Sequence, residues 1–182
     1  AIEDAFDAVV DDTGLTWPFC PASITVENET VVLHSAGEVA VEIPLKTGWN
    51  MVSVPLTVAD PSTAILFPGS VVYTWNAATK AYYAPIAIAP EVGYWVWSST
   101  DRLISISGSP ITTWTRSILA GWNMVGSIYD QNVPFSDPND LPDGIVLGYA
   151  YAWDPVTKSY DFLNTLVTLR GHWVAAVDAC SL

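Results

Sequence analysis

The residues best suited to chemistry lie in one acidic loop. Four oxygen-bearing side chains crowd between Ser136 and Gly144: Asp137, Asn139, Asp140 and Asp143. Carboxylate and amide oxygens are the ligands that Ca²⁺ prefers, and irregular loops often supply them. The spacing is not that of an EF-hand, so a solvated polar loop is the alternative to a calcium site. The sequence requires no other cofactor.

The chain lacks the residue patterns of the common catalytic sites. It has two histidines, His34 and His172, and His172 falls within an expected strand, where a core or surface position is the simpler explanation. No HExxH, CxxC, glycine-rich phosphate loop or Gly-x-Ser-x-Gly motif occurs. Two carboxylates can be placed around a glycosidic bond in any acidic protein, but nothing selects a pair here. We therefore predict that the protein is not an enzyme.

A duplicated pattern must position these residues. Gly48-Trp49-Asn50-Met51-Val52 recurs 73 residues later as residues 121–125, and Tyr73 recurs 78 residues later as Tyr151. The second copy therefore gains five residues, which we place between Asp130 and Gly144. Such self-similarity predicts an architecture of paired units.

Aromatic residues fall into two groups with respect to this duplication. Both copies keep the tryptophans at 49, 75 and 95, so we expect these side chains and their counterparts to be core. Trp17, Trp97 and Trp114 have no counterpart in the other copy. These three are the predicted surface aromatic contacts.

Strand patterns dominate both copies. Residues 71–75 and 81–83 flank a short polar connection typical of a hairpin, which would place Trp75 opposite Tyr82 and, in the second copy, Trp153 opposite Tyr160. Further strands are expected at 93–98, 102–107 and 171–177, and prolines leave little room for long helices. We predict an all-β fold, an antiparallel sandwich or barrel-like domain over residues 20–182. Its two pseudo-symmetric repeats span about 29–101 and 102–182.

By this pattern the second repeat is one strand short. A spare strand at residues 24–34 is predicted to insert beside 171–177, supplied by the same chain or by a neighbour, and to remove exposed sheet edges. Closure would bring Cys20 and Cys180 together, and an even cysteine count in a secreted chain favours a disulfide. Two buried free thiols, or a bond between chains, are the alternatives.

Residues 1–19 lie outside the repeats as an N-terminal arm. Apolar residues recur there at helical spacing between acidic ones: Ile2, Phe6, Val9 and Val10. This stripe either caps its own domain or, as an assembly arm, docks on an adjacent subunit.

Charge excludes several partners. Six lysines and arginines oppose nineteen acidic residues, a net charge of −13 that repels nucleic acid and anionic membrane surfaces. No apolar run approaches the ~20 residues of a membrane span, so we expect no membrane insertion. The chain begins at an alanine, and we expect a secreted or surface product whose signal peptide has been removed.

Three motifs carry a resemblance. They are Gly-Trp-Asn-Met-Val-Ser-Val-Pro-Leu from residue 48, Val-Tyr-Thr-Trp-Asn-x-x-Thr-Lys-x-Tyr from residue 72 and Pro-Glu-Val-Gly-Tyr-Trp-Val from residue 90. Over about residues 40–180 the chain resembles the repeated β-module of archaeal and bacterial cell-surface and secreted proteins. The resemblance implies an extracellular structural or adhesive role and supplies no catalytic residues. The second copy departs from it at residues 126–129 and at His172.

Taken together, the sequence favours a non-enzymatic extracellular structural protein. We expect a self-assembling subunit of a filament, tube or surface layer, with copies of itself as partners joined by strand or arm exchange. The alternative is a secreted carbohydrate-binding or adhesion module, whose partners are glycans.

Overall fold

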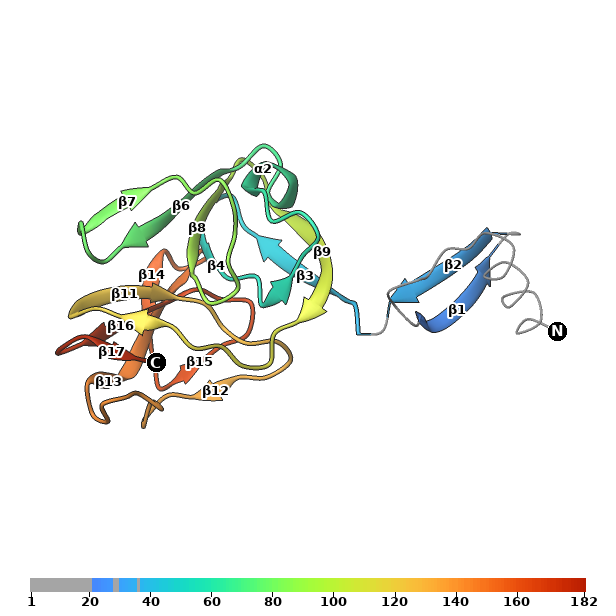
Figure 1. The fold of residues 1–182 in the computed structure, drawn as a ribbon. Helices are drawn as coiled ribbons and strands as arrows, with labels where there is room; N and C mark the ends of the chain where they lie inside the picture. Colours follow the sequence, from blue (N-terminus) through green and yellow to red (C-terminus); the bar gives the residue numbers. More distant parts are fainter. Residues whose placement is uncertain (1–20, 28–29, 36) are drawn as a thin grey trace. The chain divides into compact units, whose positions relative to one another are not determined.

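The computed structural model describes residues 21–27, 30–35 and 37–182 (Figure 1). The chain divides into two compact units, Ala1–Glu38 and Val39–Leu182. The boundary therefore lies at residue 38, whereas the sequence placed it after residue 19. The arm residues Ile2, Phe6, Val9 and Val10 lie outside the described residues, as do Trp17 and Cys20.

In the first unit, β1 (Pro21–Glu27) and β2 (Thr30–Ser35) form an antiparallel hairpin with Ile24 opposite Leu33. The expected single spare strand at 24–34 is thus two short strands. They pair with each other from Glu27 opposite Thr30 to Pro21 opposite Ser35, and only two residues separate them in the sequence, which is typical of a tight hairpin.

The second unit is built on two four-stranded antiparallel sheets, and the predicted all-β fold is confirmed. The first sheet has the order β4-β8-β6-β7, and the second has the equivalent order β11-β16-β13-β14. The strands of the first are β4 (Gly48–Val52), β6 (Val71–Asn76), β7 (Ala81–Tyr83) and β8 (Tyr94–Ser98). Those of the second are β11 (Gly121–Val125), β13 (Val146–Asp154), β14 (Ser159–Leu163) and β16 (His172–Ala176).

Shorter elements complete the unit. The sheet β3-β9-β5 joins β3 (Val39–Leu45), β9 (Arg102–Pro110) and β5 (Leu56–Thr57). The pair β10 (Ser117–Ile118) and β17 (Cys180–Ser181) and the pair β12 (Val133–Pro134) and β15 (Thr165–Leu166) lie in the second half. The helix α2 (Thr63–Leu66) is a single turn.

The predicted insertion of a strand beside residues 171–177 is wrong. Strand β16 already lies between β11 and β13, with Asn123 opposite Val174 on one side and Tyr151 opposite Trp173 on the other. A strand has only two hydrogen-bonding edges, and both are taken. The strand that follows β16 is β17, which pairs with β10 as β9 pairs with β3.

Each Gly-Trp-Asn element makes a tight turn into its sheet. Gly48 and Gly121 have φ of 100° and 92°, a left-handed conformation that favours glycine. The buried Asn50 side chain then closes the turn, because its Nδ2 donates to Lys46 O at 2.7 Å and its Oδ1 accepts from Lys46 N at 2.8 Å. Asn123 makes the same two bonds with Leu119.

Each half packs its own core on one face of its four-stranded sheet. In the first half the buried residues include Ile43, Val52, Phe67, Val96 and Ile106. In the second half they include Ile118, Val125, Phe135, Val146 and Val174. Since successive side chains of a strand point to opposite faces, the residues between these form a second, separate face on each sheet.

The two halves approach each other closely at two equivalent glycines, Gly93 and Gly171. Gly93 N donates to Met124 O at 3.4 Å, and Gly171 N donates to Met51 O at 3.2 Å. A Cβ atom on Gly93 would lie 2.7 Å from Val125 O, and one on Gly171 would lie 2.8 Å from Val52 O. Only glycine allows this approach, because these neighbours are backbone atoms that cannot rotate away.

His172 is a core residue that replaces a tyrosine. The Tyr94 hydroxyl accepts a hydrogen bond from Ala89 N at 2.7 Å, and His172 Nε2 accepts one from Val167 N at 3.0 Å, in the equivalent place. His172 is fully buried, and this burial, helped by the nearby charge of Arg170, lowers its pKa to about 3. The imidazole is therefore neutral, with Nε2 as the acceptor.

Alanine at either glycine should destabilise the second unit. We expect Gly93→Ala and Gly171→Ala each to lower the free energy of unfolding by about 1–3 kcal/mol, because backbone must shift to admit the methyl group. The control is Ser99→Ala on an exposed loop, which should stay within about 0.5 kcal/mol of the wild type. Urea denaturation measures all three, and a wild-type midpoint for Gly171→Ala would contradict the close approach.

His172 should make stability depend on pH. The pKa of its side chain is ordinary in the unfolded chain and depressed in the folded one, so protons bind first to the unfolded state. Stability should be complete above pH 6.5 and fall towards pH 3, by at most about 1.4 kcal/mol per pH unit.

His172→Tyr restores the residue of the first half and should flatten this slope relative to the wild type. Carboxylates are common to both proteins, so the difference between the two curves isolates the histidine. Parallel curves between pH 6 and pH 4 would show that His172 is not the responsible group.

Candidate binding site

The repeated tryptophans and tyrosines lie on the sheet faces opposite the two cores. Trp49 is 41% exposed and Trp122 is 46% exposed, so the prediction that the repeated tryptophans are core is wrong for this pair. The reason is strand alternation, which puts Trp49 and Met51 on the face opposite Asn50 and Val52. Both faces of each sheet are apolar, and the sequence alone does not show which one is covered.

These two aromatic faces pack against each other around a small buried centre of Met51, Met124 and Trp173. Trp95 contacts Trp153 and Trp75 contacts Trp173, each with ring centroids 5.6 Å apart and nearly perpendicular planes. Edge-to-face geometry is favourable for aromatic pairs. The contacts recur in pairs at the spacing of the duplicated sequence.

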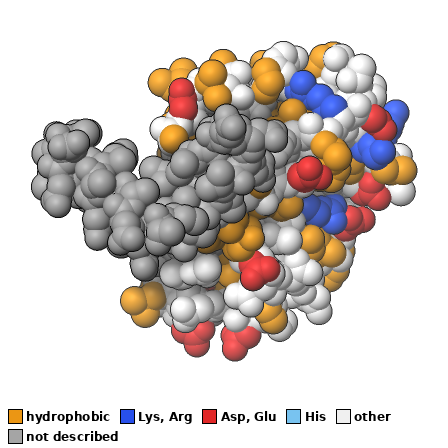
Figure 2. All heavy atoms as spheres, turned by 90° about the vertical axis from the view of Figure 1, so that its right-hand side faces the viewer, with side chains coloured by type: hydrophobic (Ala, Val, Ile, Leu, Met, Phe, Trp, Pro, Cys, Tyr) orange, Lys and Arg blue, Asp and Glu red, His pale blue; other side chains and the backbone are white. Residues whose placement is uncertain are grey.

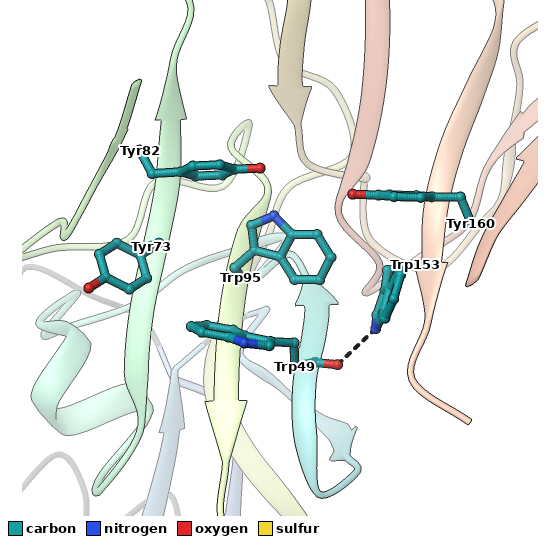
Figure 3. A pocket seen from close by; sticks show the side chains of 6 residues that line it. All are labelled: Trp49, Tyr73, Tyr82, Trp95, Trp153 and Tyr160. Atoms are coloured by element: carbon teal, nitrogen blue, oxygen red, sulfur yellow. Dashed lines mark hydrogen bonds between the residues drawn. The ribbon is translucent and has the colours of Figure 1, made fainter. Parts of the chain in front are cut away.

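Two reciprocal hydrogen bonds tie the faces together. Trp75 Nε1 donates to Trp122 O at 2.9 Å, and Trp153 Nε1 donates to Trp49 O at 3.0 Å (Figure 3). Each bond runs from an indole of one half to the backbone of the other. They fix the ring positions on both sides of the buried centre.

Two open aromatic pockets flank this centre. The first, of about 520 Å³, is lined by Trp49, Tyr73, Tyr82, Trp95, Trp153 and Tyr160 (Figure 3). The second, of about 560 Å³, is lined by Trp75, Tyr82, Trp122, Tyr151, Tyr160 and Trp173. Every lining residue of one pocket has its repeat counterpart in the other. Tyr82 and Tyr160 belong to both, and in Figure 3 their hydroxyls point toward one another from the two sides.

The shared tyrosines are placed by two hairpins that the sequence predicted. Trp75 lies opposite Tyr82 and Trp153 lies opposite Tyr160, as expected. Their ring centroids are 5.1 and 5.3 Å apart. The hairpin turns are closed by an Asx side chain, since Asn76 Oδ1 accepts from Ala78 N and Asp154 Oδ1 accepts from Val156 N.

The pocket linings consist of tryptophan and tyrosine side chains, which can stack and donate hydrogen bonds. Neither lining contains a carboxylate, histidine, cysteine or serine. Burial raises the pKa of the Tyr160 hydroxyl, which therefore stays protonated and can donate. Flat rings edged with phenol and indole groups suit an uncharged ligand that has both an apolar face and hydroxyl groups.

The predicted calcium residues are not brought together. The Asp140 side chain is buried, and its Oδ2 accepts from Ile145 N at 2.6 Å and from Val146 N at 2.8 Å. Asp137, Asn139 and Asp143 are exposed. Among the residues that the structure describes, no three acidic, histidine or cysteine side chains form a group able to hold a metal ion. The calcium site gains no support and stays a prediction.

The other predicted site residues are scattered. Trp97 is 37% exposed on β8 and lines neither pocket, whereas Trp114 is half-buried against the core of the second half. Cys180 is half-buried and forms no disulfide with another described residue, and burial raises the pKa of its thiol. Since Cys20 lies outside the described residues, the disulfide stays a prediction.

Charged side chains do not gather around one site on the face drawn in Figure 2. Acidic side chains there are spread between hydrophobic and uncharged ones, and the basic side chains lie at one side of the view beside acidic ones. Two ion pairs, Lys46 with Asp101 and Arg170 with Asp161, each at 2.8 Å, are found among the described residues. Neither contributes to a pocket lining.

No protein-family model, curated protein or solved structure matches this chain. The resemblance to the repeated β-module therefore stays a prediction. Within the described residues, none of the helices has the length and apolar character needed to cross a membrane.

Loss of either indole donor should weaken the contact between the halves. Trp75→Phe and Trp153→Phe keep an aromatic ring but remove the bond to Trp122 O or Trp49 O, so each should cost about 0.5–1.5 kcal/mol of unfolding free energy. Trp97→Phe is the control, because its indole makes no hydrogen bond to another described residue. Equal losses in all three variants would assign the effect to ring size rather than to the hydrogen bonds.

Proposed function

We propose that the protein is a non-enzymatic extracellular module that binds carbohydrate at its two aromatic pockets. The observation that carries this proposal is the lining of both pockets by tryptophan and tyrosine alone. A pyranose ring has faces of C–H groups that stack on such rings and hydroxyl groups that accept from phenol and indole donors. The pocket volumes lie in the range of small-molecule sites.

Rigidity of the rings favours binding. Trp49 contacts Trp95 at 6.3 Å between ring centroids and Trp122 contacts Trp173 at 6.5 Å, so rings at the mouth rest on rings beneath them. Side chains that are already ordered lose little conformational entropy when a ligand arrives. The exposed Trp49 and Trp122 are then the main stacking platforms.

Two equivalent pockets in one chain suit a repeating ligand. A polysaccharide presents the same ring many times, so occupation of one pocket raises the effective concentration at the other. Bases of a nucleic acid also stack on aromatic rings, but such sites need a positively charged groove for the backbone. The net charge of −13 and the uncharged linings disfavour that class of ligand.

A subunit role in a filament, tube or surface layer is the second candidate. It is favoured by an open groove in the second half, beside β10 and β17, whose lining includes Thr112, Trp114 and Leu182. An extended strand from another chain is the kind of partner that such an edge accepts. The two roles are compatible, because the groove and the aromatic pockets share no lining residue.

Carbohydrate binding is tested with a glycan array followed by calorimetric titration of the strongest ligand. We expect two sites in the wild type and one in each of Trp49→Ala and Trp122→Ala, because each removes the platform of a single pocket. The double variant should lose at least about 30-fold in affinity, as for the truncation of an aromatic anchor. Trp97→Ala, equally exposed but outside both pockets, should bind as the wild type does.

The same titration has outcomes that would reject the proposal. Absence of any glycan ligand would do so, as would unchanged binding by the double variant. Choline serves as a comparison ligand because aromatic pockets also take quaternary ammonium ions. Saturation by choline in place of a sugar would reassign the pockets to cations.

A further inference from the structure

The first half of the second unit shows how a complete strand closes its core. Strand β9 pairs with β3 along seven residue pairs, from Val39 opposite Gly108 to Leu45 opposite Arg102. On its other edge β9 pairs with β5, where Thr57 lies opposite Ser109. The side chains of Ile104 and Ile106 are thereby buried in the core.

The second half repeats only the beginning of this ladder. Ile118 lies opposite Cys180 and Ser117 opposite Ser181, in the register of Leu45 with Arg102 and Pro44 with Leu103. Arg116 and Leu182 then exchange two backbone hydrogen bonds of 2.8 and 2.9 Å. The equivalents of β3 residues 39–42 are residues 112–115, whose backbone N–H groups donate to no other described residue.

In the second half, an open groove lies where the continuation of a strand equivalent to β9 would run. Its volume is about 260 Å³, and its lining includes Thr112–Trp114, Leu182 and several residues of the lengthened loop, among them Asp137 and Asn139. The same loop holds the end of the chain in place, because Leu141 and Ser181 exchange two backbone bonds of 2.8 and 3.0 Å. Trp114 Nε1, in the same lining, is buried without a hydrogen-bond partner among the described residues.

The register and the lining define the occupant. The occupant must be an extended segment that runs antiparallel to residues 112–115. Hydrogen-bonded pairs occur at every second residue of an antiparallel ladder, and Arg116 belongs to one of them. The backbone carbonyls of the occupant would therefore accept from the N–H groups of Trp114 and Thr112. Its inward side chains must be apolar or small, as Ile106 and Gly108 are in β9. The sequence of β1 has this alternation, since Ile24 and Val26 stand two residues apart as Ile106 and Gly108 do, and Leu182 already holds the place equivalent to Ile104.

We propose that β1 from the hairpin of a second copy of this chain docks in this groove and extends the β10 ladder. A two-stranded hairpin is marginal on its own, so pairing with a third strand stabilises it. The chain divides between its hairpin unit and the unit that carries the groove, so each copy offers one donor strand and one acceptor groove. A contact between unlike surfaces joins copies head to tail into an open chain. This inference does not depend on carbohydrate binding.

The oligomeric state of the full chain tests the acceptor side. Sedimentation velocity is measured in 0.5 M NaCl, which screens the repulsion between copies of net charge −13. The wild type should form oligomers whose size grows with concentration. Thr112→Pro removes an N–H donor that faces the incoming strand, and it should raise the concentration needed for assembly at least tenfold.

Thr113→Pro is the matched control, because its N–H points away from the groove in this alternation, and β3 itself carries a proline, Pro44, at a position of the same alternation. It should assemble as the wild type does. Circular dichroism establishes that both variants are folded. A monomeric wild type at all concentrations would overturn the proposal, and so would equal assembly of the two proline variants.

Photo-crosslinking tests the donor side in the same full chain. A benzoyl-phenylalanine in place of Ile24 should join two chains, and peptide mapping should find the attachment among residues 112–114. A crosslink within one chain would show that the hairpin of the same copy fills the groove, and one to another region would show that β1 docks elsewhere. Either result would overturn docking by a second copy.

Discussion

The close backbone approach between the halves is the constraint on which the binding surface depends. Val52 bridges to Arg170 and Val92 bridges to Val125, with Gly93 and Gly171 between them. Their Cα atoms lie so near that a Cβ on either glycine would be 3.2 Å from the other Cα. Each aromatic pocket draws its lining from both halves, so a wider separation would open the pockets and break the indole bonds to Trp49 O and Trp122 O.

Because side chains alternate along a strand, the eight strands of the two sheets form an aliphatic core on one face and an aromatic surface on the other. One face of each sheet buries aliphatic side chains such as Val52, Val96 and Val174 and stabilises the half. The other face carries aromatic side chains that are only partly covered. Because the two faces use different residues, a change at an exposed ring such as Trp49 leaves the aliphatic core intact.

The two copies of the repeat carry different residues at several aligned positions. The position of Tyr94 is taken by His172, which accepts the equivalent hydrogen bond with a smaller ring. Trp97 corresponds to Ala175, and Val41 corresponds to Trp114 beside the open groove. The framework bonds of Asn50 and Asn123 are kept. The copies therefore share their turns and sheet order but differ at the edge where β9 closes one half and a groove remains in the other.

The local strand pairings can be predicted from the amino-acid sequence alone. The hairpins that oppose Trp75 to Tyr82 and Trp153 to Tyr160 follow from neighbouring residues and a short turn, and the all-β class follows from period-two patterns and prolines. The place of His172 within a strand follows from its alignment with Tyr94, whereas its burial does not. Each of these depends on contacts between residues close in the chain or on the duplication.

Which sheet faces are covered depends on the packing of the two halves and is not predictable from local sequence patterns. Alternation gives every strand two faces, but whether Trp49 is buried depends on how far the other half overlaps it, which no local pattern records. The central place of β16 depends on its pairing with β11, about fifty residues earlier, and this long-range pairing occupies the edge at which the sequence predicts the spare strand. The acidic loop shows the same limit: the inward position of Asp140, whose Oδ2 accepts from Ile145 N and Val146 N, depends on how the loop folds and not on the spacing of its acidic residues.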